Sequence, residues 1–138
     1  MKCTDKLCTV YQHLMSIKGE CAFQLIKEYN MSELTLRQIE YIKLFDQHEY
    51  MTISKLAEIL DLSKPSITEM IKKFIKLDCV YKQKCSEDGR VSYLKLTQKG
   101  QNIARFEHLS MLKVVSRISE SLTEEELEQL AELLGKIK

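Results

Sequence analysis

Apolar residues recur every three or four positions along most of the chain, which is the spacing that places them on one face of an α-helix. Each of these periodic stretches is bounded by polar residues that favour helix ends. The pattern therefore predicts six helices. They cover residues 7–29, 35–48, 52–61, 63–77, 97–115 and 123–137.

Several of these helices begin at a residue that can cap the free backbone N–H groups of a first turn. Thr35 with Gln38 has the form of a capping box, and Thr123 with Glu126 has the same form. The helix that follows Ser63 carries the only proline in its first turn, where proline is tolerated. The buried positions expected in that helix are Ile67, Met70 or Ile71, Phe74 and Leu77.

The periodicity changes to a rough alternation after residue 79. Residues 80–84 and 91–96 are rich in β-branched and aromatic side chains and flank the polar stretch 85–90. This pattern predicts a β-hairpin whose turn contains Gly89, and we expect Gly89 to adopt a positive φ angle there. The fold class expected is mainly α (α+β): four helices, a hairpin and two further helices.

The first predicted helix is apolar on more than one side. One face runs from Leu7 through Leu14 to Leu25, and a second includes Met15 and Phe23. A helix with two apolar faces must bury both, and a chain of 138 residues has little core to spare for it. This helix is therefore a candidate interface with a second copy of the chain.

Charge is balanced overall at a formal +1, but it is uneven along the sequence. Residues 63–99 hold nine basic and four acidic side chains, a net charge of +5. A local cationic excess is typical of a site for a polyanion such as nucleic acid. An ordinary solvated lysine-rich surface is the alternative interpretation of the same charges.

A short helix, a tight turn and a second helix with a basic polar face describe a helix-turn-helix, and the following hairpin makes it a winged one. The second helix would enter the major groove of DNA and the hairpin tip the minor groove. A solvated helix face and a protein-binding module are the alternatives. The DNA-contacting residues expected on this helix are Ser63, Lys64, Ser66, Thr68, Glu69, Lys72 and Lys73.

Five motifs in the same order resemble the MarR family of transcriptional regulators. They are residues 34–38, 52–57, 63–76, 88–90 and 96–100. The resemblance implies a single domain over residues 1–138. Residues 35–99 would form the DNA-binding lobe, and residues 1–30 with 100–138 the dimerisation helices.

The resemblance also implies a function and a set of wing residues. Such proteins are homodimers, many of them repressors, that bind palindromic double-stranded DNA and respond to a small phenolic or lipophilic effector, a metal or an oxidant. Asp88 and Arg90 match the Asp-x-Arg motif of the family wing, with Arg90 as the minor-groove cation. Lys82 and Lys84 would contact phosphate. Asp78 departs from the glycine that the family usually has after the recognition helix, a change that aspartate tolerates.

Other chemistry has weaker support in the residues. Five cysteines are present, and Cys8, near the start of the first helix, is the candidate for a thiol-based redox sensor. The histidines are far apart, without metal-ligand spacing, and no phosphate loop or nucleophile motif occurs. We therefore expect no enzyme activity, no metal and no cofactor. With neither a signal sequence nor a membrane span in view, we expect a cytoplasmic protein with no membrane partner.

Overall fold

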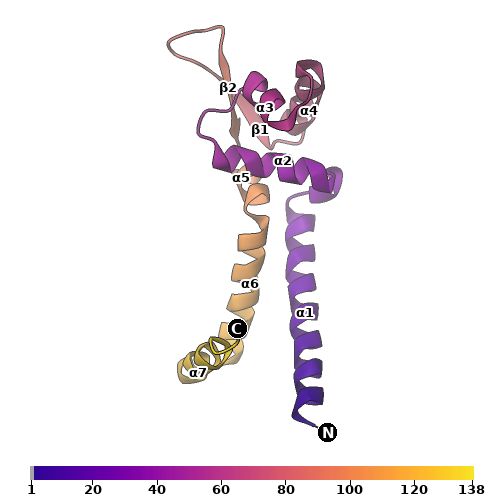
Figure 1. Cartoon of the computed structure of the whole chain (residues 1–138), viewed down its shortest axis with the longest axis vertical. Coiled ribbons are helices and arrows are strands. Elements are labelled where there is room, and N and C mark those ends of the chain that lie inside the picture. The colour runs from indigo at the N-terminus through magenta and orange to yellow at the C-terminus, as the bar shows by residue number, and fades with distance from the viewer. Residues whose placement is uncertain (1) are drawn as a thin grey trace. The chain divides into compact units, whose positions relative to one another are not determined.

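The computed structural model describes residues 2–138, which divide into two compact units. One unit comprises the chain up to Leu25 together with Glu107–Lys138, and the other comprises Ile26–Phe106. Figure 1 follows the chain through the elements of both units. The elements are α1 (Cys3–Glu28), the 3-10 helix η1 (Met31–Glu33), α2 (Leu36–Gln47), α3 (Ile53–Leu60), α4 (Lys64–Lys76), β1 (Val80–Lys84), β2 (Ser92–Leu96), α5 (Gln98–Ala104), α6 (Phe106–Ser121) and α7 (Glu124–Leu134).

The capping residues expected from the sequence are confirmed. Thr35 and Gln38 form a reciprocal capping box at the start of α2, and Thr123 and Glu126 form another at the start of α7. The hydroxyl of each remaining capping residue accepts a hydrogen bond from a backbone N–H of the first turn. These residues are Thr52 for α3, Ser63 for α4 and Thr97 for α5.

Three expectations about the helices and the turn are corrected. The helix expected over 97–115 is two helices, α5 and α6, because the chain leaves helical geometry at Arg105. The Arg105 side chain forms an ion pair with Asp46 of α2, with an Nε–Oδ2 distance of 3.1 Å. The last helix ends at Leu134, so Ile137 lies outside it. Gly89 does not have a positive φ angle, because the hairpin turn is made without a left-handed residue.

Left-handed backbone occurs instead at Asn30, Asp61 and Asp78. Asn and Asp tolerate this conformation better than other side chains with a Cβ atom. At Asp78 the φ angle is 60°, and the N–H of Cys79 donates to the carbonyl of Phe74 at 2.8 Å. This is a Schellman motif, so the tolerance expected of Asp78 is confirmed.

The hairpin is a two-stranded antiparallel sheet in which Val80 pairs with Leu96 and Lys84 with Ser92. One feature was not expected from the sequence: Met51, just before α3, bridges to Leu94. Its carbonyl accepts the N–H of Leu94 at 2.8 Å, which ties the hairpin to the segment that leads into α3.

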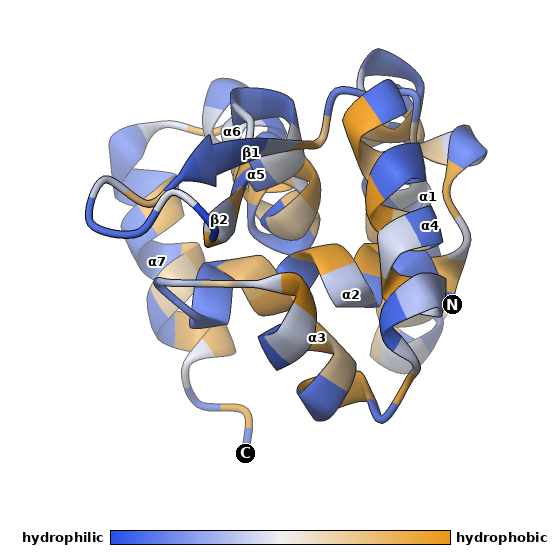
Figure 2. Ribbon diagram, turned by 90° about the horizontal axis from the view of Figure 1, so that it is seen from above, coloured by the Kyte–Doolittle hydropathy of each residue, from blue (hydrophilic) through white to orange (hydrophobic). Residues whose placement is uncertain are grey.

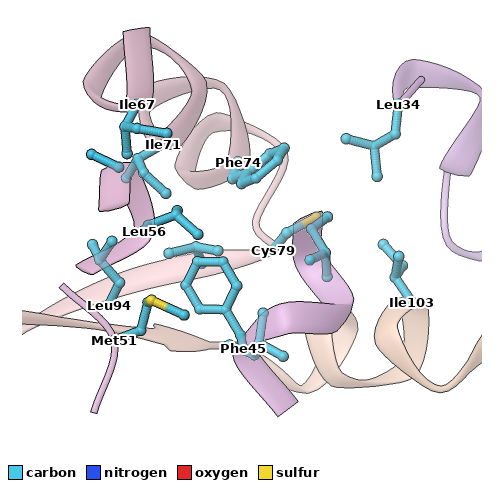
Figure 3. Packing of buried hydrophobic residues seen from close by; sticks show 14 of the residues in the cluster. Leu34, Phe45, Met51, Leu56, Ile67, Ile71, Phe74, Cys79, Leu94 and Ile103 are labelled. Atoms are coloured by element: carbon cyan, nitrogen blue, oxygen red, sulfur yellow. The ribbon is translucent and has the colours of Figure 1, made fainter. Parts of the chain in front are cut away.

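The core lies in the Ile26–Phe106 unit and is built from α2 to α5 and the base of the hairpin (Figure 3). Phe74 of α4 is fully buried among side chains from the other elements, as are Ile42 and Ile103. Of the α4 residues expected to be buried, Ile67, Ile71 and Phe74 are buried, whereas Met70 and Leu77 are half-buried. The polar face of α4 therefore stays outside the core.

Gly100 permits a close approach between α5 and Cys79, in the segment that joins α4 to β1. A Cβ atom at this position would overlap the carbonyl oxygen of Cys79 and press on a side-chain carbon of Leu96. The Cys79 carbonyl is already fixed, because it accepts the N–H of Thr97 at 3.0 Å. The backbone therefore has little freedom to move away from an added methyl group.

We expect Gly100→Ala to destabilise this unit by about 3 kcal/mol, because the overlap involves backbone that is held by hydrogen bonds. Thermal unfolding followed by circular dichroism measures the change. Gly19→Ala is the matched control, since a Cβ atom at Gly19 meets nothing within 4 Å. A Gly100→Ala protein that melts with the wild type would contradict the close approach.

The other unit contains most of α1 and α6 together with α7. Helices α1 and α6 run antiparallel in Figure 1, and Arg117 of α6 donates to Glu20 of α1 with an Nη1–Oε2 distance of 2.6 Å. The Glu20 carboxylate raises the pKa of Arg117. Large apolar side chains remain exposed on this unit. They are Leu7, Val10, Tyr11, Met15, Phe23, Met111, Leu112, Val115, Leu133, Leu134 and Ile137.

Within residues 2–138, no helix has both the length and the apolar character that a bilayer crossing demands.

Candidate nucleic-acid interface

Helices α3 and α4 are joined by the three residues 61–63. Asp61 ends α3 in the left-handed conformation, and the N–H of Leu62 donates to the Ala57 carbonyl at 3.0 Å. Ser63 then starts α4 by accepting the N–H of Ser66 at 3.3 Å. Two consecutive helix-end motifs thus make a tight, well-defined turn between the helices.

The first turn of α4 carries polar side chains that are accessible to a ligand. Ser63, Lys64 and Ser66 are exposed, and the Ser63 hydroxyl donates to that of Ser66 at 2.8 Å. Thr68 is half-buried, and its hydroxyl donates to the Lys64 carbonyl at 2.9 Å. Of the four predicted DNA contacts in this part of the helix, Thr68 is the least accessible.

One turn further along, Glu69 and Lys72 form an exposed ion pair with an Oε1–Nζ distance of 3.1 Å. Both side chains are more than half exposed, so water screens the pair and its contribution to stability is small. A phosphate could therefore take the place of Glu69 at the Lys72 ammonium at little cost.

Lys73 differs from its neighbour. Its side chain is half-buried, and Nζ donates to Oε1 of Gln38 in α2 at 2.9 Å. The structure thus places this predicted DNA contact against another helix of the same unit.

The hairpin presents its cations to solvent, and Figure 2 shows most of β1 and part of the turn in the blue of hydrophilic residues. Lys82 and Lys84 are exposed on the same face of β1, two residues apart. At the turn, Asp88 Oδ1 accepts the backbone N–H of Arg90 at 3.0 Å and lies 3.6 Å from its Nε. The Arg90 side chain is 95% exposed.

A groove of about 460 Å³ lies between the hairpin and the start of α3. Lys82 and Arg90 line it on the hairpin side, and Ser54 lines it from the first turn of α3. The groove therefore brings together two predicted cations and a helix N-terminus, which is favourable for an anion. Ser54 was not predicted from the sequence, although its position shortly after the capping residue Thr52 is a signal for it.

The far end of α4 is held by the start of α5. Lys99 Nζ donates to the Leu77 carbonyl at 2.7 Å, and the Thr97 hydroxyl donates to the Asp78 carbonyl at 2.6 Å. A cation is favourable at this end, because the helix dipole is negative there. These two bonds explain what the motif at 96–100 does, a role that the sequence pattern alone did not reveal.

The cysteines occupy different environments. Cys3 and Cys8 are exposed on α1, whereas Cys21 and Cys79 are buried. Burial raises the pKa of Cys79. Cys85, directly after β1, is half-buried, and hydrogen bonds from the backbone N–H groups of Asp88 and Glu87 lower its pKa. The two cysteines that flank β1 are separated by about 20 Å of extended strand, too far for a disulfide.

The lowered pKa predicts that Cys85 reacts with iodoacetamide at lower pH in the folded protein than in the unfolded chain, because the thiolate is the nucleophile. Peptide mapping by mass spectrometry across a pH series gives the pH of half-maximal rate at this residue. The same peptide in urea-unfolded protein is the control. Equal midpoints in the two states would contradict the expectation.

Among residues 2–138, no three histidine, cysteine, aspartate or glutamate side chains gather in a way that could hold a metal ion.

A helix-turn-helix followed by a cationic hairpin defines a winged helix-turn-helix protein. In agreement with this geometry, residues 34–92 match the model of the MarR family. The match agrees with the resemblance that the sequence motifs show to the same family.

Solved structures share the fold. The YusO protein from Bacillus subtilis is 18% identical over 99% of this chain and 96% of that chain, with a TM-score of 0.55. A point mutant of Lactococcus lactis ZitR is 26% identical over 74% of this chain and 71% of that chain, with a TM-score of 0.50. A point mutant of S. aureus MepR, bound to an oligodeoxyribonucleotide, is 18% identical over 99% and 96%, with a TM-score of 0.58. These likenesses confirm the mainly α winged-helix fold expected for this chain.

Proposed function

We propose that the protein is a homodimeric, sequence-specific regulator of transcription that binds a palindromic operator in double-stranded DNA and acts as a repressor. One observation carries the proposal. A single compact unit presents the exposed polar start of α4 and, on the adjoining hairpin, an arginine that is 95% exposed and held at its backbone by Asp88.

The helix is proposed to read the DNA sequence. An α-helix fits the major groove, and the exposed side chains of its first turn, those of Ser63, Lys64 and Ser66, can reach base edges and phosphates. Glu69 can accept from the amino group of cytosine once Lys72 turns to a phosphate. Helix α3 then crosses the DNA backbone.

The hairpin is proposed to hold the adjoining backbone and the minor groove. The Arg90 side chain is 95% exposed and its contact with Asp88 is screened by water, so its guanidinium can enter a narrow, negative minor groove. The groove between the hairpin and α3 is proposed to receive a phosphate from the DNA backbone, between Lys82 and the first turn of α3.

Dimerisation is proposed to occur through the unit that contains most of α1 and α6 together with α7. Within residues 2–138, this unit exposes the large apolar side chains named above, and such surfaces are typical of protein interfaces. A two-fold dimer presents two identical copies of α4 and the hairpin, so the DNA site that it binds is a palindrome.

Control by a small phenolic or lipophilic effector is the part of the proposal that rests on the resemblance to the MarR family. S. aureus MepR, 17% identical over 99% of this chain and 94% of that chain with a TM-score of 0.58, was solved bound to ethidium bromide. Planar lipophilic compounds are therefore the first to test. An effector can act only by binding the DNA-competent and DNA-incompetent states unequally.

Selection from a pool of random duplexes, followed by gel-shift titration at about 50 mM and 200 mM salt, tests the proposal. We expect enrichment of a palindrome whose affinity falls steeply with salt, because several lysines displace condensed cations. A scrambled duplex and heparin are the controls. Equal binding to all three would mean a non-specific basic surface, and a lack of binding to any would favour a protein-binding module.

A further inference from the structure

Lys73 lies on α4, the proposed recognition helix, yet its ammonium group makes a hydrogen bond within the protein. Its Nζ donates to Gln38 Oε1 at 2.9 Å, and the two residues are 35 positions apart in the sequence. Lys72 and Lys76, its neighbours on the same helix, are exposed, whereas Lys73 and Gln38 are both half-buried. The contact therefore joins α4 to the start of α2 through a partly shielded hydrogen bond.

The acceptor in this contact, Gln38 Oε1, also takes part in the capping box of α2. Gln38 Oε1 also accepts the N–H of Thr35 at 3.0 Å, and the Thr35 hydroxyl accepts the N–H of Gln38 at 3.1 Å. Lys73 thus bonds to the capping box of α2 and, through it, to the residue at which that helix begins.

The electrostatics of the two helix ends oppose each other here. Lys73 stands in the last turn of α4, where the helix dipole favours a cation, whereas the start of α2 carries a partial positive charge that disfavours an ammonium group beside it. Ordering a long lysine side chain also costs conformational entropy. The contact is then best understood through what it holds: the C-terminal half of α4 against α2, by a bond separate from those that Lys99 and Thr97 make to the end of α4.

We propose that Lys73 is a positioning residue, which sets the orientation of the recognition helix through the capping box of α2 and does not neutralise a DNA phosphate. This inference rests on the proposed function, because the orientation matters only if α4 reads DNA. It also separates two adjacent lysines that the sequence alone placed in one set: Lys72 meets phosphate, and Lys73 meets Gln38.

The salt dependence of DNA binding distinguishes the two roles. A methionine in place of lysine keeps the apolar stem and removes the charge. Lys72→Met should lower the slope of log Kd against log salt by about one unit per protomer, because one phosphate contact is lost. Lys73→Met should leave the slope unchanged and weaken affinity about fivefold, the effect of one lost hydrogen bond of about 1 kcal/mol. Thermal melts establish that each variant is folded at the assay temperature.

Two further variants test the path through Gln38. Lys73→Arg retains a donor and should restore the affinity that Lys73→Met loses. Gln38→Leu removes the acceptor, so Lys73→Met should add no further loss of affinity in the Gln38→Leu background.

A drop in slope for Lys73→Met equal to that for Lys72→Met would overturn the inference and leave the proposed function standing, as would unchanged affinity in Lys73→Met. If the wild-type protein binds no duplex, the proposed function fails, and the role of Lys73 in DNA binding fails with it.

Discussion

Leu112→Glu should convert the proposed dimer to a monomer. It should also weaken binding to a palindromic duplex by about 100-fold or more, because two linked DNA-binding units bind far more tightly than one. Leu112 is one of the exposed apolar side chains on α6, and it is about half exposed in the single chain. A carboxylate there would have to be buried without a partner in the interface, which is strongly unfavourable. Analytical ultracentrifugation and gel shift on the same sample measure both effects.

Leu36→Glu provides the matched control for this experiment. Leu36 is 84% exposed at the start of α2, in the other unit, so the same substitution there removes an equally apolar side chain outside the proposed interface. We expect it to remain dimeric. A Leu112→Glu protein that stays dimeric, or a wild-type protein that is monomeric at assay concentrations, would contradict the assignment of the interface.

Arg90→Ala should weaken DNA binding about tenfold or more without changing the melting temperature. The side chain is 95% exposed, and its nearest ionic partner, Asp88, lies 3.6 Å away in a screened position, so the fold does not depend on it. The loss in affinity should therefore come from the DNA contact alone. Fluorescence anisotropy with a labelled operator duplex measures it.

Asp88→Ala separates the presentation of Arg90 from its charge. Asp88 accepts the backbone N–H of Arg90 at 3.0 Å, so its loss should loosen the turn and weaken DNA binding less than Arg90→Ala does. An unchanged affinity in Arg90→Ala would remove the hairpin from the proposed interface.

Local signals made most of the fold predictable from the sequence. A capping box such as Thr35–Gln38 is defined by residue types three positions apart, and the geometry it predicts is present. The end of α4 was predictable in the same way, because Asp78 is one of the few residues with a Cβ atom that tolerates a positive φ angle. The polar face of α4 followed from helical periodicity, and its early residues are exposed as expected.

The features that the sequence did not reveal depend on contacts between distant residues. The break at Arg105 coincides with an ion pair to Asp46, which lies 59 positions away. Helical periodicity placed Lys73 on the polar face of α4 but did not reveal its contact with Gln38 of α2, 35 positions away. Which side chains meet DNA stays a prediction until a duplex is bound.

The turns at the two ends of α4 have a consequence for the affinity for DNA. Asp61 and Asp78 are exposed, and both adopt the left-handed conformation. Glycine could adopt the same conformation without adding a negative charge. In a protein proposed to bind DNA, two negative charges beside α4 repel the phosphates of any duplex. Because this repulsion does not depend on the base sequence, it weakens binding to an operator and to any other duplex alike, and the discrimination between them is left to the base contacts of α4.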